Sequence, residues 1–169
     1  HDVKSVEYYI KEYIDVLGVS DELKSTVKPY VHFALTSQDT TTLALWLQLL
    51  TVDEMLIDQI RYVYEKICRF FNSYKRVSML SRTHGQPATP TTIGKEFMVF
   101  AERLENQIEL FQIKPIAKFG GCNGNFNAHY VAYPNIDWML FGDRFLEQLG
   151  LCRAQFTTQI DHYDMMCEY

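Results

Sequence analysis

The sequence has little glycine and proline, with eight Gly and five Pro among its 169 residues. Because disordered, collagen-like and low-complexity chains are rich in these residues, the composition excludes those classes. There is no run of 18 or more apolar residues, which a membrane-spanning helix needs, and no basic start and apolar core of a signal peptide. We therefore expect a soluble, cytoplasmic protein that does not bind a membrane.

Cysteine is sparse, and its four positions form no C-x-x-C pair. This spacing fits neither a zinc framework nor the dense disulfide pattern of a small secreted domain. We predict a reducing compartment and four free thiols, at Cys68, Cys122, Cys152 and Cys167.

Positive charge is also scarce, since 16 Lys and Arg stand against 21 Asp and Glu and give a net charge of −5. Neither sign is gathered into a long block. A nucleic-acid-binding protein normally carries a basic surface, so this partner is disfavoured. A small-molecule ligand fits the charge balance better, and the length fits one domain of ordinary size.

The sequence is rich in helical periodicity. Apolar residues recur at steps of three and four over residues 3–17, 39–72, 93–112 and 138–149, and a shorter helix is expected over 21–28 with Ser20 as its N-cap. The stretch 39–72 has neither Gly nor Pro, and a helix of about 33 residues would be about 50 Å long. Such a length predicts an all-α fold, built as a long-helix bundle or as the core of an oligomer.

Two segments break this pattern. Residues 80–92 carry Gly85, Pro87 and Pro90 among polar side chains, and we interpret them as an irregular polar loop. Residues 120–127 combine Gly and Asn, which tolerate positive φ, and predict a tight turn or short hairpin. A phosphate-binding loop is disfavoured there, because the G-K-[ST] ending and the strand-loop-helix context are missing.

The polar segment 80–92 holds the most informative side chain, His84. A histidine beside a glycine in a proline-stiffened loop can be held rigidly and still reach a ligand, and it exchanges a proton near neutral pH. The alternative is that His84 only hydrogen-bonds the loop to neighbouring helix ends.

Short motifs along the whole chain resemble those of one family. They are H-D-V at residues 1–3, H-F-A-L-T-S-Q-D at 32–39, R-T-H-G-Q-P-A-T-P at 82–90, G-N-F-N-A-H at 124–129 and T-T-Q-I at 157–160. Together they are similar to segments of the fumarase/aspartase superfamily, and most of all to those of its adenylosuccinate lyase branch. The all-α long-helix bundle expected above is the fold of that superfamily.

The resemblance implies an enzyme, a carbon-nitrogen lyase of purine nucleotide biosynthesis. Members of this branch release fumarate by β-elimination from adenylosuccinate, giving AMP, and from the succinylated aminoimidazole carboxamide ribotide SAICAR, giving AICAR. The family assembles as homotetramers around a central helical bundle, with each active site shared between subunits. The expected partners are these small molecules and further copies of the chain, with no cofactor and no metal.

Family positions imply the site residues. His84 corresponds to the general acid that protonates the departing nitrogen, and His1 to a second, supporting active-site histidine. The residues that the resemblance places at the substrate are Asp2, Thr36, Ser37, Thr83 and Gln159. Thr36 and Ser37 match a hydroxyl pair that binds a substrate carboxylate, which suits their place just ahead of a long helix whose N-terminus favours anions.

Structural roles compete with some of these assignments. Thr36 and Ser37, or equally Asp39, can simply cap the helix that follows. His129 and the cluster at 162–164 resemble metal ligands, but no third ligand is spaced to complete a site. We therefore predict no metal centre.

One superfamily segment is missing. The mobile loop S-S-x-M-P-x-K-x-N-P, whose serine is assigned as the base, does not occur. The chain also starts at His1 rather than Met and ends inside a predicted helix. We expect residues 1–169 to be part of the central helical-bundle domain, without the N-terminal residues, the catalytic loop and the C-terminal domain, and to be inactive alone.

Two other functions stay open. A sibling lyase of the same superfamily, such as argininosuccinate lyase, uses related loops, and substrate profiling separates it from the first choice. A non-catalytic helical assembly module explains the apolar stripes equally well, because three-four spacing indicates packing and not chemistry. It does not explain the polar segment around His84 or the pair Thr36 and Ser37, and ligand binding at those residues discriminates.

Overall fold

The computed structural model describes residues 2–111 and 114–168 of the chain, and most of them are helical. The all-α fold class expected from the periodicity is thereby confirmed. The chain divides into two compact units, a first unit of residues 1–48 and 114–169 and a second unit of residues 49–113.

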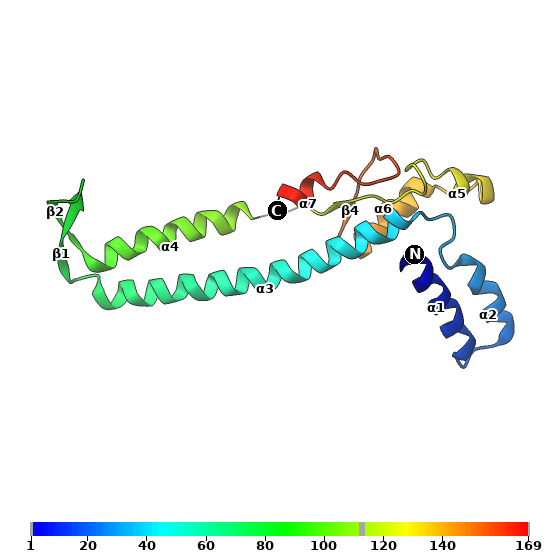
Figure 1. The fold of residues 1–169 in the computed structure, drawn as a ribbon, viewed down its shortest axis with the longest axis horizontal. Helices are drawn as coiled ribbons and strands as arrows, with labels where there is room; N and C mark the ends of the chain where they lie inside the picture. The colour runs from blue at the N-terminus through cyan, green and yellow to red at the C-terminus, as the bar shows by residue number, and fades with distance from the viewer. Residues whose placement is uncertain (1, 112–113, 169) are drawn as a thin grey trace. The chain divides into compact units, whose positions relative to one another are not determined.

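The longest element is helix α3, Ser37–Tyr74, with 38 residues, drawn in cyan to green in Figure 1. It confirms the predicted long helix and extends it by two residues at each end. Its length is about 57 Å at 1.5 Å per residue. Its N-terminal part belongs to the first unit and its C-terminal part to the second.

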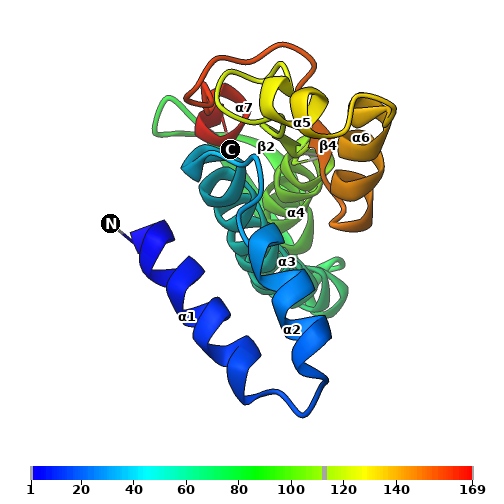
Figure 2. The same ribbon diagram turned by 90° about the vertical axis from the view of Figure 1, so that its right-hand side faces the viewer.

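The first unit opens with helices α1, Asp2–Val16, and α2, Asp21–Val27, which lie side by side (Figure 2). The predicted cap of α2 is confirmed, because the Ser20 hydroxyl accepts a hydrogen bond from the Leu23 amide at 3.3 Å. A short 3-10 helix, Lys28–Tyr30, follows and leads toward α3.

The core of the first unit forms where the start of α3 meets the C-terminal third of the chain. That third contains β3 (Ile116–Ala117), α5 (Asn127–Ala132), α6 (Trp138–Gln148), β4 (Cys152–Arg153) and α7 (Asp164–Glu168). Trp46 of α3 is 1% exposed, and its indole N–H donates to the carbonyl of Ile116 at 2.8 Å. The other buried apolar side chains of this core include Leu43, Ala117, Phe119, Phe126, Trp138, Leu146 and Leu151.

The Gly/Asn segment forms the predicted tight turn. Its ends are joined by the amide of Phe126, which donates to the carbonyl of Gly120 at 2.8 Å. Helix α5 starts directly after this turn, and β3 and β4 pair in parallel, with Ile116 opposite Cys152. These three short elements were not predicted, because so few residues carry no readable periodicity.

The second unit contains an antiparallel hairpin, and the prediction of an irregular loop at 80–92 is wrong. Strand β1, Ser78–Thr83, pairs with β2, Gln86–Thr92, and Thr83 lies opposite Gln86. The two connecting residues have positive φ, 51° at His84 and 75° at Gly85. Positive φ at both central residues is the mark of the type I′ turn, which matches the twist of hairpin strands. A two-stranded ribbon also tolerates proline, because each strand has a free edge.

Helix α4, Ile93–Leu110, follows β2 and runs beside the C-terminal part of α3 (Figure 1). Thr92 caps it, since its hydroxyl accepts from the Lys95 amide at 3.3 Å. The rings of Phe70 and Phe97 hold the two helices together, with centroids 4.2 Å apart. None of the helices in the described residues is long and apolar enough to cross a membrane.

Candidate functional site

Thr83 and His84 lie at the tip of the hairpin in the second unit. Both are exposed, and His84 occupies the first central position of the turn. A non-glycine residue with positive φ is uncommon and costs free energy, so the turn holds the backbone of His84 in this conformation at that cost. His1, the other predicted active-site histidine, lies outside the described residues.

Thr36 and Ser37 lie in the first unit, where α3 begins. Ser37 is the first residue of the helix, Thr36 precedes it, and both are half-buried. The carboxylate of Asp39 reaches back and accepts from the Thr36 amide at 2.9 Å, as the acidic residue of a capping box does. Of the capping groups that the sequence offered, the carboxylate of Asp39 therefore caps the helix.

Gln159 is exposed in the segment before α7. This segment is joined to the start of α3 by the side chain of Gln38, whose amide oxygen accepts from the Asp161 amide at 3.3 Å and from the Tyr163 hydroxyl at 2.8 Å. Within the first unit, the structure thus brings the stretch that carries Gln159 to the helix start that carries Ser37.

Asp2 is exposed at the start of α1 and lines a hollow of about 390 Å³. His32, Thr40 and Glu7 line the same hollow. Hydrogen bonds from Lys11 and Lys4 lower the pKa of Glu7 to about 2, so Glu7 stays ionised over the physiological range. At this hollow the charge of Glu7 is thus balanced by the ammonium groups of Lys4 and Lys11.

Asp39 and Lys118 form a fully buried ion pair, which sequence reasoning missed. The Lys118 ammonium lies 3.0 Å from one carboxylate oxygen of Asp39, and both side chains have no exposed surface. The same oxygen accepts from the Gly120 amide at 3.1 Å, and the other accepts from the Gly121 amide at 2.9 Å. Lys118 also donates to the Gly121 carbonyl at 2.6 Å. A signal existed, because Lys118 stands alone in an otherwise apolar and glycine stretch, I-A-K-F-G-G.

His129 is 2% exposed, and its Nδ1 atom has no hydrogen-bond partner among the described residues. The rings of Phe33, Phe126 and Trp138 surround it, with centroids 4.8 to 5.9 Å away. Burial lowers the pKa of His129 from its ordinary value, and the carboxylate of Asp39 opposes this shift in part. A neutral, structural imidazole results.

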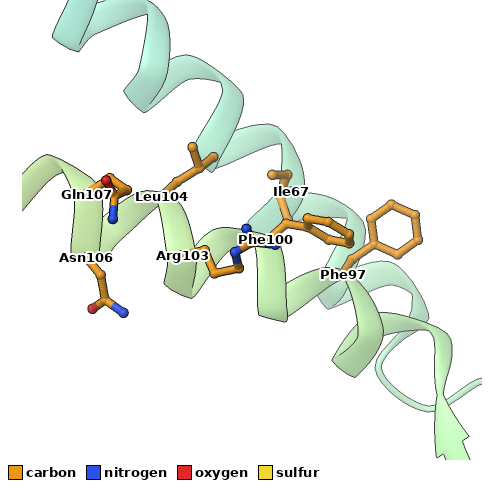
Figure 3. Close-up of a pocket in the computed structure, with 7 residues that line it drawn as sticks. All are labelled: Ile67, Phe97, Phe100, Arg103, Leu104, Asn106 and Gln107. Carbon is orange, nitrogen blue, oxygen red and sulfur yellow. The ribbon is translucent and has the colours of Figure 1, made fainter. Parts of the chain in front are cut away.

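Two hollows of similar size differ in character. One, in the first unit, measures about 740 Å³ and is lined mainly by aromatic and aliphatic side chains, with His129 and Asp39 at its wall. The other, in the second unit, measures about 690 Å³ and lies between α3 and α4 (Figure 3). Its residues are Ile67, Phe97, Phe100, Arg103, Leu104, Asn106 and Gln107.

Within residues 2–111 and 114–168, no three His, Cys, Asp or Glu side chains cluster closely enough to hold a metal ion. The four cysteines are free thiols in the structure. The polar chemistry of the chain is therefore concentrated at the hairpin tip in the second unit and at the start of α3 in the first.

Solved structures share this fold. A fumarate lyase from Mesorhizobium sp. BNC1 superposes on this chain with a TM-score of 0.70 and 21% sequence identity. The superposition covers 99% of this chain and 38% of the fumarate lyase chain. A β-carboxy-cis,cis-muconate cycloisomerase from Acinetobacter calcoaceticus sp. ADP1 matches 92% of this chain and 33% of its own, with a TM-score of 0.69 and 24% identity. The chain therefore shares its fold with both of these solved structures.

The sequence matches the family described as "Lyase" over residues 1–169, and the chain belongs to that family. It is 47% identical over 97% of its length to an adenylosuccinate lyase from Dictyostelium discoideum, and 42% identical over 99% to one from Escherichia coli K12. These relatives confirm the family resemblance of the motifs. The chain spans about a third of their length, 36% in both cases.

Proposed function

We propose that the protein to which these residues belong is an adenylosuccinate lyase, a carbon-nitrogen lyase of purine nucleotide biosynthesis. The observation that carries the proposal is the 47% identity, over nearly the whole chain, to a relative that bears this name. The hairpin geometry supports it, because the histidine expected to be the acid is exposed at the tip of the hairpin, where a substrate can reach it.

The proposed reaction is a β-elimination. A base removes a proton from the carbon beside a carboxylate, the bond from the neighbouring carbon to nitrogen breaks, and fumarate and AMP leave. His84 donates a proton to the departing nitrogen, which lowers the barrier because the leaving group would otherwise depart as an anion. The base comes from a segment outside residues 1–169, since S-S-x-M-P-x-K-x-N-P does not occur here.

The succinyl carboxylates need hydrogen-bond donors, because negative charge builds up next to them during proton removal. The hydroxyls of Thr36 and Ser37 are suited to this role. They stand at the N-terminus of a 38-residue helix, where the helix dipole favours an anion. Thr83 is assigned to the succinyl group beside His84, and Gln159 to substrate binding.

His1 is assigned a supporting catalytic role, and Asp2 is assigned to substrate binding. SAICAR is the second proposed substrate and gives AICAR and fumarate by the same bond cleavage. The protein is assigned to the cytoplasm, without a cofactor, a nucleic acid or a membrane as partner, and residues 1–169 to the central helical-bundle domain.

A homotetramer with shared active sites is proposed from the second unit, where α3 and α4 leave many large apolar side chains exposed. These include Val52, Met55, Leu56, Tyr62, Val63, Phe97, Val99, Phe100 and Leu110. Exposed apolar area of this extent is unusual on a monomer and favours burial against other chains. Single helices contributed by several copies would cover it in a bundle.

The test is cleavage of adenylosuccinate by the full-length gene product, followed by ultraviolet absorbance. His84→Asn is the sharpest variant, because asparagine accepts positive φ and keeps the type I′ turn while removing the acid. We expect a loss of kcat of about a hundredfold or more, as for a missing general acid. The matched control is His162→Asn, at another exposed histidine, with activity within about twofold of the parent.

Failure of the parent to cleave adenylosuccinate would refute the named activity, and sibling substrates such as argininosuccinate would be assayed next. Full activity in His84→Asn would refute the acid role alone. The 169-residue chain by itself is expected to show no turnover, and measurable turnover by a preparation of proven intact mass would contradict that expectation.

A further inference from the structure

The start of α3 presents an electrostatic problem. If Thr36 and Ser37 bind a carboxylate, the anion must approach a helix end that already holds the carboxylate of Asp39, two and three residues away in sequence. Like charges at close range repel, and the repulsion is strong where water is excluded. Asp39 is 1% exposed, so water screens its charge poorly.

Lys118 resolves this problem in the structure. Its ammonium is buried against the Asp39 carboxylate at 3.0 Å, and the charges of the two groups cancel. Three backbone amides, those of Thr36, Gly120 and Gly121, donate to the same carboxylate and satisfy its remaining lone pairs. The helix end is left with no net side-chain charge from this pair and with its own dipole intact.

The pair also links segments that are far apart in the sequence. Asp39 and Lys118 are separated by 79 positions, and the bonds of Asp39 join the residue before α3 to the glycine turn at 120–121. The backbone amide of Lys118 donates to Asp161 at 3.2 Å, in the stretch that carries Gln159. A shift of Lys118 would therefore move the start of α3, the glycine turn and the stretch that carries Gln159 together.

We propose that Lys118 and Asp39 are positioning residues of the lyase site: Lys118 neutralises and anchors Asp39, so that the start of α3 can bind a substrate carboxylate through Thr36 and Ser37. This inference rests on the proposed function. Neither residue touches the substrate. Lys118 acts through Asp39, and Asp39 acts through the amide of Thr36.

The test compares three variants of the full-length protein. Lys118→Met removes the cation and leaves the Asp39 charge unbalanced, and we expect KM for adenylosuccinate to rise about tenfold or more. Asp39→Asn combined with Lys118→Met removes both charges, and we expect KM to return to within about threefold of the parent. Arg153→Met is the matched control, since Arg153 is also a buried cation, 2% exposed in its side chain and paired with Asp143. Its KM should stay within about twofold.

KM in the double variant tests the charge argument, and a KM that stays raised in the folded double variant overturns the proposal. Loss of one charge of a buried pair also destabilises a fold, and removal of both restores stability. Positioning is therefore separated from bulk stability by the split between KM and kcat: a purely structural role lowers the amount of active enzyme, and hence the apparent kcat, at unchanged KM, and that result also overturns the proposal. The proposal is equally overturned if Arg153→Met raises KM as much as Lys118→Met does. If Lys118→Met fails to fold, Lys118→Gln takes its place, because it also removes the cation but keeps a hydrogen-bond donor near the Asp39 carboxylate, and the same outcomes decide.

Hydrogen exchange keeps this inference separable from the proposed function. In Lys118→Met, exchange at the amides of Thr36, Gly120 and Gly121 should quicken at least about tenfold, and Arg153→Met should leave it unchanged. If the parent cleaves no adenylosuccinate, the proposed function fails, and quickened exchange still shows that the pair organises this helix end. Unchanged exchange at all three amides contradicts the anchoring and ends the inference.

Discussion

Gly94→Ala is expected to destabilise the second unit. A Cβ atom at position 94 would lie 2.7 Å from the backbone N and Cα of Lys75 and 2.9 Å from the carbonyl oxygen of Phe71. All three obstacles are backbone atoms, so rotation of a side chain cannot relieve the clash. The first turn of α4 must move away from the end of α3 and from Lys75, because Cβ contacts below 3.0 Å are essentially never found in proteins.

The magnitude follows from two opposed effects. Overpacking of this kind costs about 1–3 kcal/mol. Alanine regains up to about 1 kcal/mol over glycine in a helix, and less in the first turn. We expect a net loss of about 1–2 kcal/mol in the free energy of unfolding, measured as a lower urea midpoint of the full-length protein at unchanged m-value.

The same variant should lower activity, because Gly94 lies at the base of the hairpin. The Ile93 amide donates to the Val77 carbonyl at 2.9 Å and closes that base. Since small misplacements of a reacting group cost large factors in rate, we expect kcat for adenylosuccinate to fall about tenfold. Gly18→Ala is the control, because nothing lies within 4 Å of its added Cβ. A midpoint equal in Gly94→Ala and the parent would refute the packing argument.

Two further predictions concern the first unit. Burial lowers the pKa of His129, so the folded protein binds a proton at this histidine less readily than the unfolded chain does. The resulting contribution to stability is fully present above the unfolded pKa, near 6.5. It is lost as the pH falls toward the lower pKa of the folded state. His129→Leu should therefore reduce the drop in melting temperature between pH 7.5 and about 5, and an unchanged drop would contradict the shift. Trp46→Phe removes the N–H group that donates to the Ile116 carbonyl, and it should lower the free energy of unfolding in urea by about 1–3 kcal/mol. A urea midpoint equal to that of the parent would contradict this prediction.

The helices could be predicted because their signals are local. The apolar spacing of α3 and the Ser20 cap each depend on a few neighbouring residues, and the structure has the helices there. The family, too, was readable from short motifs, and the relatives confirm it. The hairpin was misread because Gly85 and two prolines indicate a loop when no partner strand is visible.

The sequence by itself determined the helical class, the position of the long helix and the family, because periodicity, caps and motifs each depend on residues that are close together in the sequence. Only the tertiary structure decided that Lys118 is buried rather than solvated, that Asp39 is its partner, and that His129 is enclosed by aromatic rings. A charge can be buried only where a distant segment supplies the opposite charge and the donors to satisfy it. That condition is met across 79 positions of sequence, beyond the reach of any local pattern.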